Sequence, residues 1–143
     1  MPSMTAEGHT YEELNVGDHA AIHCQVTRDD VIAMSAVSGD TNPMHLDESY
    51  ARGTIFNGCI VHGVHTLGFI SRACGLILPG PGWAFTKMSA EFHRPVRPND
   101  TVQVIVEVIK KENNRIQCLS NCFVGTRQVL TGSATLFDAR KRK

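Results

Sequence analysis

The longest apolar pattern in the chain runs through residues 61–78, where hydrophobic side chains recur on almost every side of a helix. Small residues at Gly63, Gly68, Ser71 and Gly75 suit close approach by another element. A helix without a polar face is buried, and the run Pro-Gly-Pro-Gly that follows ends it. The pattern predicts one long helix at the centre of the fold.

Alternation of apolar and polar residues dominates the second half of the chain. It is clearest at 101–108, where valine occupies every second position, and this period of two is typical of a half-buried strand. Further strands are predicted at 83–93, 116–124 and 128–137. Turn-forming pairs such as Asn113-Asn114 separate them. These runs predict an antiparallel meander.

The first part of the chain is expected to be mixed. Weak alternation at 20–26 predicts a strand. Thr27 then caps a helix with acidic residues in its first turn, and that helix ends at Gly39. A short helical turn is expected at 47–51. A buried helix and an antiparallel sheet that wraps around it make an α+β fold.

Length and charge narrow the function classes. A chain of 143 residues forms one domain, expected to span 1–143 with its core at about 16–137. The formal net charge of zero argues against nucleic acid as a partner, and the basic run at 140–143 is expected to be a solvated tail. No window resembles a membrane span, and residues 1–14 lack the features of a secretory signal.

The cysteines indicate the compartment. There are five, an odd number without the spacing of metal ligands. We therefore expect reduced thiols that act as small apolar residues in a cytoplasmic protein.

The candidate chemistry lies in the segment 38–45, which reads Ser-Gly-Asp-Thr-Asn-Pro-Met-His. It places Asp40 and His45 five residues apart, on a turn that Gly39 and Pro43 are expected to keep from being helical. A carboxylate and an imidazole can together hold one water and exchange protons with it. Taken alone, such a segment is more often an ordinary turn, with Asp40 bonded to backbone amides and His45 at the surface.

A second motif, Ile-Val-His-Gly, ends at Gly63. The two motifs at this spacing resemble the hydratase-2 signature of the MaoC-like dehydratases, the R-specific enoyl-CoA hydratases. The resemblance covers about 16–137 and is sharpest at 38–63. It implies a hotdog fold, and it implies that Asp40 and His45 bind the catalytic water.

Gly63 begins the predicted buried helix, where the first N–H groups have no intrahelical partner. These donors and the helix dipole suit an oxygen that gains negative charge. The resemblance implies that the Gly63 amide is the oxyanion donor and that a side chain there would obstruct a thioester. The alternative is a glycine required only for packing.

Three further residues are expected to support the site. Asn42 resembles a family residue that shapes the site, and it also suits the turn before proline. His62 is expected to be a helix cap or a core hydrogen-bonding residue. Ser71 matches a family serine near the catalytic Asp, so it supports Asp40 or is a small packing residue.

Two other features of the sequence bear on the site. His62 and His65 are one helical turn apart, but no third ligand of suitable spacing follows, so no metal site is expected. At 57–59 the chain reads Asn-Gly-Cys, where the family commonly has a charged residue and then proline, and this predicts a looser loop. Cys59 has no evident base partner and is not expected to be a nucleophile.

Together with these residues, the resemblance implies a hydro-lyase of fatty acid metabolism. It would hydrate trans-2-enoyl-CoA or acyl-carrier thioesters to R-3-hydroxyacyl thioesters and catalyse the reverse dehydration, with no cofactor. The alternatives are a hotdog acyl-thioesterase and a non-catalytic acyl-thioester-binding module. A short sheet on one helix leaves an edge and a face to cover, so a homodimer is expected.

Overall fold

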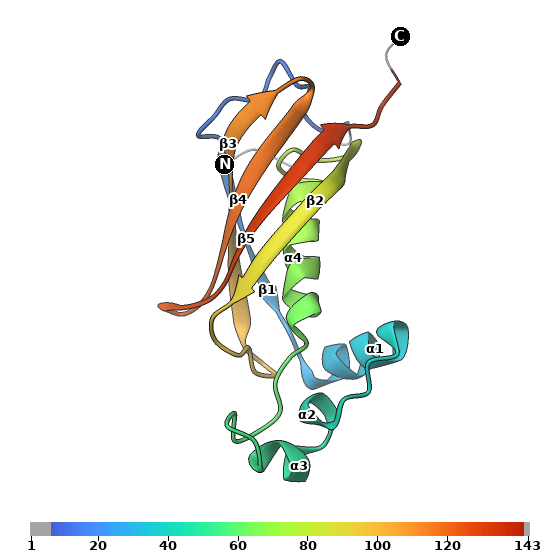
Figure 1. Ribbon diagram of the computed structural model, residues 1–143, viewed down its shortest axis with the longest axis vertical. Coiled ribbons are helices and arrows are strands. Elements are labelled where there is room, and N and C mark those ends of the chain that lie inside the picture. Colours follow the sequence, from blue (N-terminus) through green and yellow to red (C-terminus); the bar gives the residue numbers. More distant parts are fainter. Residues whose placement is uncertain (1–6, 142–143) are drawn as a thin grey trace.

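A computed structural model describes residues 7–141. Its main element is a five-stranded antiparallel sheet with the strand order β1-β3-β4-β5-β2 (Figure 1). The expected antiparallel sheet is confirmed. The strands are β1 (His19–Gln25), β2 (Trp83–Phe92), β3 (Thr101–Glu112), β4 (Arg115–Val124) and β5 (Arg127–Asp138).

The strongest sequence signal coincides with the centre of the sheet. The valines at every second position of β3 are fully buried, and their polar neighbours point to the other face. At the β3–β4 turn, Asn113 and Asn114 have φ values of 51° and 60°, which asparagine tolerates better than most residues. The alternation therefore decides which face of the sheet forms the core. These valines are Val102, Val104, Val106 and Val108.

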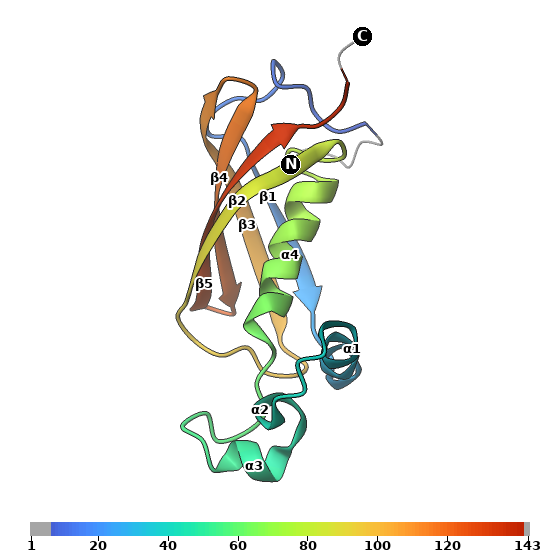
Figure 2. The same ribbon diagram turned by 45° about the vertical axis from the view of Figure 1, so that its right-hand side comes forward.

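Helix α4 (Gly63–Leu76) lies along one face of the sheet (Figure 2). It buries Thr66, Ile70, Ala73 and Cys74. On strand β5, Gly132 faces this helix, and a Cβ atom there would lie 3.4 Å from the Ile70 side chain, in van der Waals contact.

The expectation that this helix is buried all round is wrong for the single chain. The side of α4 that faces away from the sheet is open, and Val64 and Leu76 are 53% and 45% exposed. The reason is that one sheet covers only one side of a helix. An apolar surface remains on the outer side.

Three short helices lie beyond the end of the sheet, near the start of α4 (Figure 1). They are α1 (Arg28–Ser38), α2 (Pro43–Leu46) and α3 (Glu48–Arg52). As predicted, Thr27 and Asp30 form a capping box at the start of α1, and Gly39 ends it with φ of 77°.

The segment that carries His45 is helical, which corrects the prediction of a non-helical turn. Pro43 occupies the first position of α2 and Asn42 is its N-cap. Proline is tolerated at that position because its missing N–H would have no intrahelical partner. Proline therefore begins the helix here instead of preventing it.

The basic end of the chain is partly anchored. The Arg140 guanidinium donates to the Asp138 carboxylate and to the Glu7 and His9 carbonyl oxygens. The expectation of a solvated tail is therefore wrong for Arg140. The end of the basic run, at 142–143, lies outside the described residues.

Two further expectations concern composition. All five cysteines are buried and free, at Cys24, Cys59, Cys74, Cys118 and Cys122. Among residues 7–141, no helix has the length and hydropathy needed to cross a membrane.

Candidate active site

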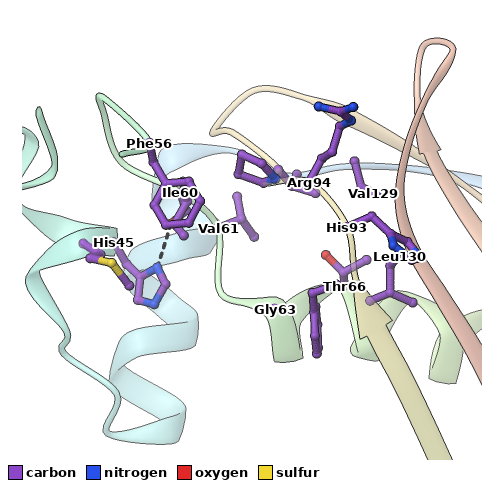
Figure 3. Close-up of a pocket in the computed structure, with 14 residues that line it drawn as sticks. His45, Phe56, Ile60, Val61, Gly63, Thr66, His93, Arg94, Val129 and Leu130 are labelled. Atoms are coloured by element: carbon purple, nitrogen blue, oxygen red, sulfur yellow. Dashed lines mark hydrogen bonds between the residues drawn. The ribbon is translucent and has the colours of Figure 1, made fainter. Parts of the chain in front are cut away.

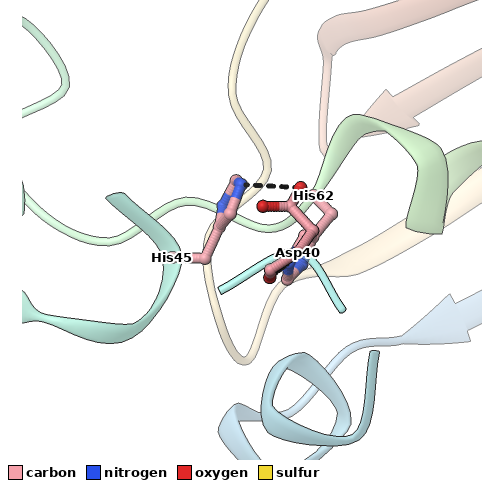
Figure 4. A group of neighbouring side chains, drawn as sticks. All are labelled: Asp40, His45 and His62. Carbon is pink, nitrogen blue, oxygen red and sulfur yellow. Dashed lines mark hydrogen bonds and ion pairs between the residues drawn. The ribbon is translucent and has the colours of Figure 1, made fainter. Parts of the chain in front are cut away.

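The Asp40 side chain is held by its own turn. Its Oδ1 accepts a hydrogen bond from the Asn42 N–H at 3.1 Å, and its backbone N–H donates to Ser38 Oγ at 3.1 Å. Asp40 directly follows Gly39, the residue that ends α1. The second carboxylate oxygen, Oδ2, is turned toward His45 (Figure 4).

The His45 imidazole has a defined tautomer. Its Nδ1 lies 2.7 Å from the Ile60 carbonyl oxygen. A carbonyl oxygen only accepts, so Nδ1 carries the proton and Nε2 is left as an acceptor when the ring is neutral. The His45 side chain is 8% exposed, so it is held in place with its acceptor nitrogen directed at Asp40.

The separation of the two groups suits a shared water. Asp40 Oδ2 and His45 Nε2 are 4.0 Å apart, which is too long for a direct hydrogen bond. A water about 2.8 Å from each atom fits between them. Both atoms are acceptors, so each can accept a hydrogen bond from one proton of that water. The pair that the motif indicated is thus brought together with the spacing that acid–base chemistry on one water needs.

His62 connects the site to the helices around it. It is 1% exposed, and its Nε2 lies 3.1 Å from both Ser35 Oγ and the Asp40 carbonyl oxygen. Its ring stacks on His45 with centroids 3.8 Å apart. Its side chain makes no cap hydrogen bond to α4. Of the two roles expected for His62, the structure favours the core hydrogen-bonding residue.

Asn42 fixes the helix on which His45 stands. Its Oδ1 accepts from the Met44 N–H at 3.1 Å, and its extended backbone, with φ of −52° and ψ of 125°, is typical of a residue before proline. The turn-supporting role is therefore visible in the contacts of Asn42.

Gly63 is the first residue of α4, and its N–H has no hydrogen-bond partner in the described part of the chain. It lines a cavity of about 330 Å³ together with His45 (Figure 3). A free N–H at a helix start is a ready donor to a developing oxyanion. Apolar side chains form most of the remaining wall, among them Met44, Phe56, Ile60, Val61, Phe92 and Val96.

The loop before α4 is tied down, contrary to the expectation of a loose one. The Arg97 guanidinium donates to the carbonyl oxygens of Phe56, Gly58 and Cys59. The Cys59 N–H donates to the Glu48 carboxylate at 3.2 Å and lowers the pKa of that carboxyl. The hydrogen bonds from Arg97 and to Glu48 hold this loop in place without a proline.

Cys59 itself does not resemble a nucleophile. Burial raises the pKa of its thiol, and the neighbouring Glu48 carboxylate acts in the same direction. A thiol is a poor nucleophile when the thiolate is disfavoured.

Ser71 is not brought to Asp40 within one chain. It is exposed on the outer side of α4, roughly 12 Å along the helix from Gly63 at 1.5 Å per residue. Among residues 7–141, no hydrogen bond joins it to Asp40, and it does not line the cavity with His45.

Within residues 7–141, one group of side chains has ligand atoms close enough for a cation. Ligand atoms of Asp40, His45 and His62 lie within 4.8 Å of one another. The His45 and His62 rings are stacked, however. A metal about 2.1 Å from a nitrogen of each ring would lie far out of both ring planes, where imidazole has no lone pair. The geometry is better suited to a water than to a metal ion.

Sequence reasoning missed several residues that hold the site. They are Arg28, Ser35, Glu48 and Arg97, each of which contacts a segment far away in the chain. Contacts of this kind leave no periodic signal. Only the capping and turn residues within the motif were recognisable.

Comparison with protein families and known proteins places this geometry in context. Residues 16–126 match the MaoC like domain. The chain is 36% identical over 135 residues to a 3-hydroxybutyryl-CoA dehydratase of Methylorubrum extorquens, covering 93% of this chain and 86% of that protein. It is 35% identical over 130 residues to an (R)-specific enoyl-CoA hydratase of Rhodospirillum rubrum, covering 90% of each.

A solved structure shares the whole architecture. An unliganded R-hydratase from Pseudomonas aeruginosa superposes with a TM-score of 0.87 and 35% sequence identity. The match covers 94% of this chain and 88% of that one.

Proposed function

Because the chain belongs to the MaoC-like dehydratase family, with the hotdog fold of R-hydratases, we propose that it is an R-specific enoyl-CoA hydratase. It adds water to trans-2-enoyl thioesters to give R-3-hydroxyacyl thioesters, and it catalyses the reverse dehydration. The observation that carries the proposal is the 4.0 Å gap between Asp40 Oδ2 and His45 Nε2, beside a cavity that the free Gly63 N–H lines.

The reaction follows from this geometry. The water held between Asp40 and His45 gives up a proton to one of these two acceptors while its oxygen bonds to C3 of the enoyl group. Electron density moves to the thioester oxygen, and the Gly63 N–H stabilises the resulting enolate. The proton then returns to C2 on the same face. All atoms of the water end in the product, and no redox partner is required.

A thioesterase is the main alternative, because it would use a carboxylate to direct water at the thioester carbon instead. The stacked and buried His45–His62 pair favours the hydratase, whereas the unpaired Gly63 N–H suits the oxyanion of either reaction. A carboxylate-only mechanism has no use for an imidazole held in one tautomer.

Hydration of crotonyl-CoA tests the proposal. The ultraviolet absorbance of the conjugated enoyl group is expected to fall without release of free thiol. Thiol release would identify a thioesterase, and no change in either signal would identify a binding module. The product is expected to be R-3-hydroxybutyryl-CoA with both new bonds on one face, since one water serves both.

The product's configuration is checked by a coupled reaction. An S-specific 3-hydroxyacyl-CoA dehydrogenase with NAD⁺ is expected to give no NADH from this product. As the control, the same mixture is supplied with S-3-hydroxybutyryl-CoA, which must give NADH. NADH formation from crotonyl-CoA would mean that water attacks the opposite face, and the assignment of Asp40 and His45 would then be wrong.

We also propose that the working unit is a homodimer of single-domain chains, each with its core at about 16–137. Two surfaces support this. Strand β2 is ten residues long and lies at the edge of the sheet, and the outer side of α4 exposes Val64 and Leu76. A long unpaired edge and an apolar helix face are normally covered. Ser71 stands on this helix face, so a second copy would surround it.

Sedimentation velocity tests the dimer. The expected mass is twice that of the chain. Replacing Val64 with Glu is expected to shift the population toward the monomer, because a charge would be buried at the contact. Glu substitution at Thr126, an exposed residue of the β4–β5 turn, is the control and should leave the mass unchanged. A monomeric native protein at micromolar concentration would contradict the proposal.

The substrate and the compartment complete the proposal. The substrate class is an acyl thioester of CoA or of an acyl carrier. The reduced state of five buried cysteines supports a cytoplasmic location.

A further inference from the structure

Arg28 is the first residue of α1, yet its side chain ends at another helix. Its two terminal nitrogens donate to the carbonyl oxygens of His45 and Leu46, both at 2.5 Å. These residues close α2, which is only four residues long. The last carbonyl groups of a helix have no intrahelical partner, so the guanidinium fork supplies the missing donors. Hydrogen bonds from a charged donor are stronger than neutral ones.

The same guanidinium also lies near the segment that bonds the His45 ring. It lies beside the thiol of Cys59 and opposes the rise in pKa that burial causes there. Cys59 directly precedes Ile60, whose carbonyl oxygen accepts from His45 Nδ1. Arg28 therefore stands between the backbone that carries His45 and the segment that orients its ring.

We propose that Arg28 is a positioning residue that sets the place of His45 Nε2 relative to Asp40 Oδ2. The proposal rests on the function proposed above, because it concerns the water held between these atoms. No other side chain bonds the His45 carbonyl oxygen in the described part of the chain. Without the fork, the carbonyl groups of His45 and Leu46 lose their charged donors, and α2 is held mainly by the Ile60 backbone, which bonds Met44 and His45. A displacement of roughly 1 Å at a catalytic group can lower the rate about 100-fold.

We therefore expect the loss of Arg28 to lower kcat and to leave KM nearly unchanged. Arg28 does not line the cavity, so its loss should leave substrate binding nearly unchanged. Arg28→Met keeps the aliphatic stem and removes both donors. It is expected to lower kcat about 10- to 100-fold, with KM for crotonyl-CoA within about twofold of the native value.

A double substitution separates positioning from general damage. If Arg28 acts through His45, Arg28→Met should lower kcat by no more than about twofold in a His45→Gln background. The same fold loss in both backgrounds would overturn the proposal, since lost folding or a direct role acts regardless of His45. Arg115→Met removes an exposed arginine in the β3–β4 hairpin, far from the site, and is expected to retain native kcat.

A second measurement does not need activity. In the ¹⁵N-labelled native protein, His45 is expected to show a protonated Nδ1 that exchanges slowly with water. It is assigned by its loss in His45→Gln. Arg28→Met should broaden or abolish it, while Arg115→Met should keep it. An unchanged signal in Arg28→Met overturns the proposal. If the His45 signal responds as expected in these variants but the native protein hydrates no crotonyl-CoA, the proposed function is wrong and the positioning role of Arg28 stands.

Arg28→Lys covers the case in which Arg28→Met fails to fold. Lysine keeps the charge but offers a point donor instead of a fork. Its kcat is expected to lie between those of the native protein and Arg28→Met, with the His45 signal weakened. Native kcat together with a native His45 signal in Arg28→Lys would contradict the need for two donors.

Discussion

Replacing Asp40 with Asn is expected to lower turnover of crotonyl-CoA by about 10²- to 10⁴-fold, the usual contribution of a general acid–base group. The substitution is nearly isosteric. The remaining amide oxygen can still accept from the Asn42 N–H, as Asp40 Oδ1 does at 3.1 Å. The amide nitrogen takes the place of Oδ2 and removes an acceptor for the water. The loss therefore reports on chemistry more than on folding.

His45→Gln should have an effect of similar size, because it removes the acceptor nitrogen that faces Asp40. Both groups act on one water, so the double variant is expected to be scarcely slower than the slower single variant. Losses that multiply would show that the two residues do not act as a unit. Asp29→Asn and His23→Gln change the same residue types at exposed positions and serve as controls.

Gly63→Ala is expected to lower kcat/KM by about 10²- to 10³-fold, the cost of losing an oxyanion donor. The N–H remains, but a methyl group enters the space from which the thioester reaches it. The folded state should change little, since alanine favours a helix over glycine by about 1 kcal/mol. Thermal unfolding and steady-state kinetics check the two expectations together.

The Phe92 ring lies close to Gly63, so the experiment needs a second background. A Cβ atom at Gly63 would lie 2.6 Å from the Phe92 ring. Phe92 is 57% exposed, so its ring can turn away. In the Phe92→Ala background the clash disappears. If kcat/KM then returns to that of Phe92→Ala, the loss came from the clash with Phe92, and the expected obstruction of the thioester by a side chain at position 63 is wrong. Gly75→Ala lies on the same helix with nothing within 4 Å and is the matched control.

The sequence allowed the sheet and the long helix to be predicted because both carry periodic patterns. Val102 to Val108 mark a buried strand face at every second position. Thr27 and Gly39 are local signals, so α1 was placed with the correct caps. The outer side of α4 was not predictable in the same way. An apolar pattern indicates a surface that will be covered, but not whether the same chain covers it.

Within the site, the sequence indicated which residues meet but not how they are held. Asp40, His45 and Gly63 follow from motifs with fixed spacing. The helical state of Pro43 to Leu46 was missed because proline both breaks and begins helices, and the next residues alone do not decide between these roles.

The arginine contacts were beyond sequence reasoning for a different reason. Arg28 reaches a carbonyl group 17 residues away, and Arg97 reaches one 41 residues away. A long flexible side chain can contact many segments, and neither periodicity nor composition says which one the fold brings near. Such contacts follow only from the tertiary structure.

The burial of every cysteine makes the molecule well suited to site-directed labelling. Burial raises the pKa of Cys122 to about 12 and raises that of the Cys24 thiol as well, so these groups hold little of the thiolate with which maleimides react. A cysteine introduced at Ile55, which is 95% exposed on the loop after α3, would therefore be the one thiol that a dye finds. A fluorophore there would report whether this anchored loop changes its surroundings when a thioester enters.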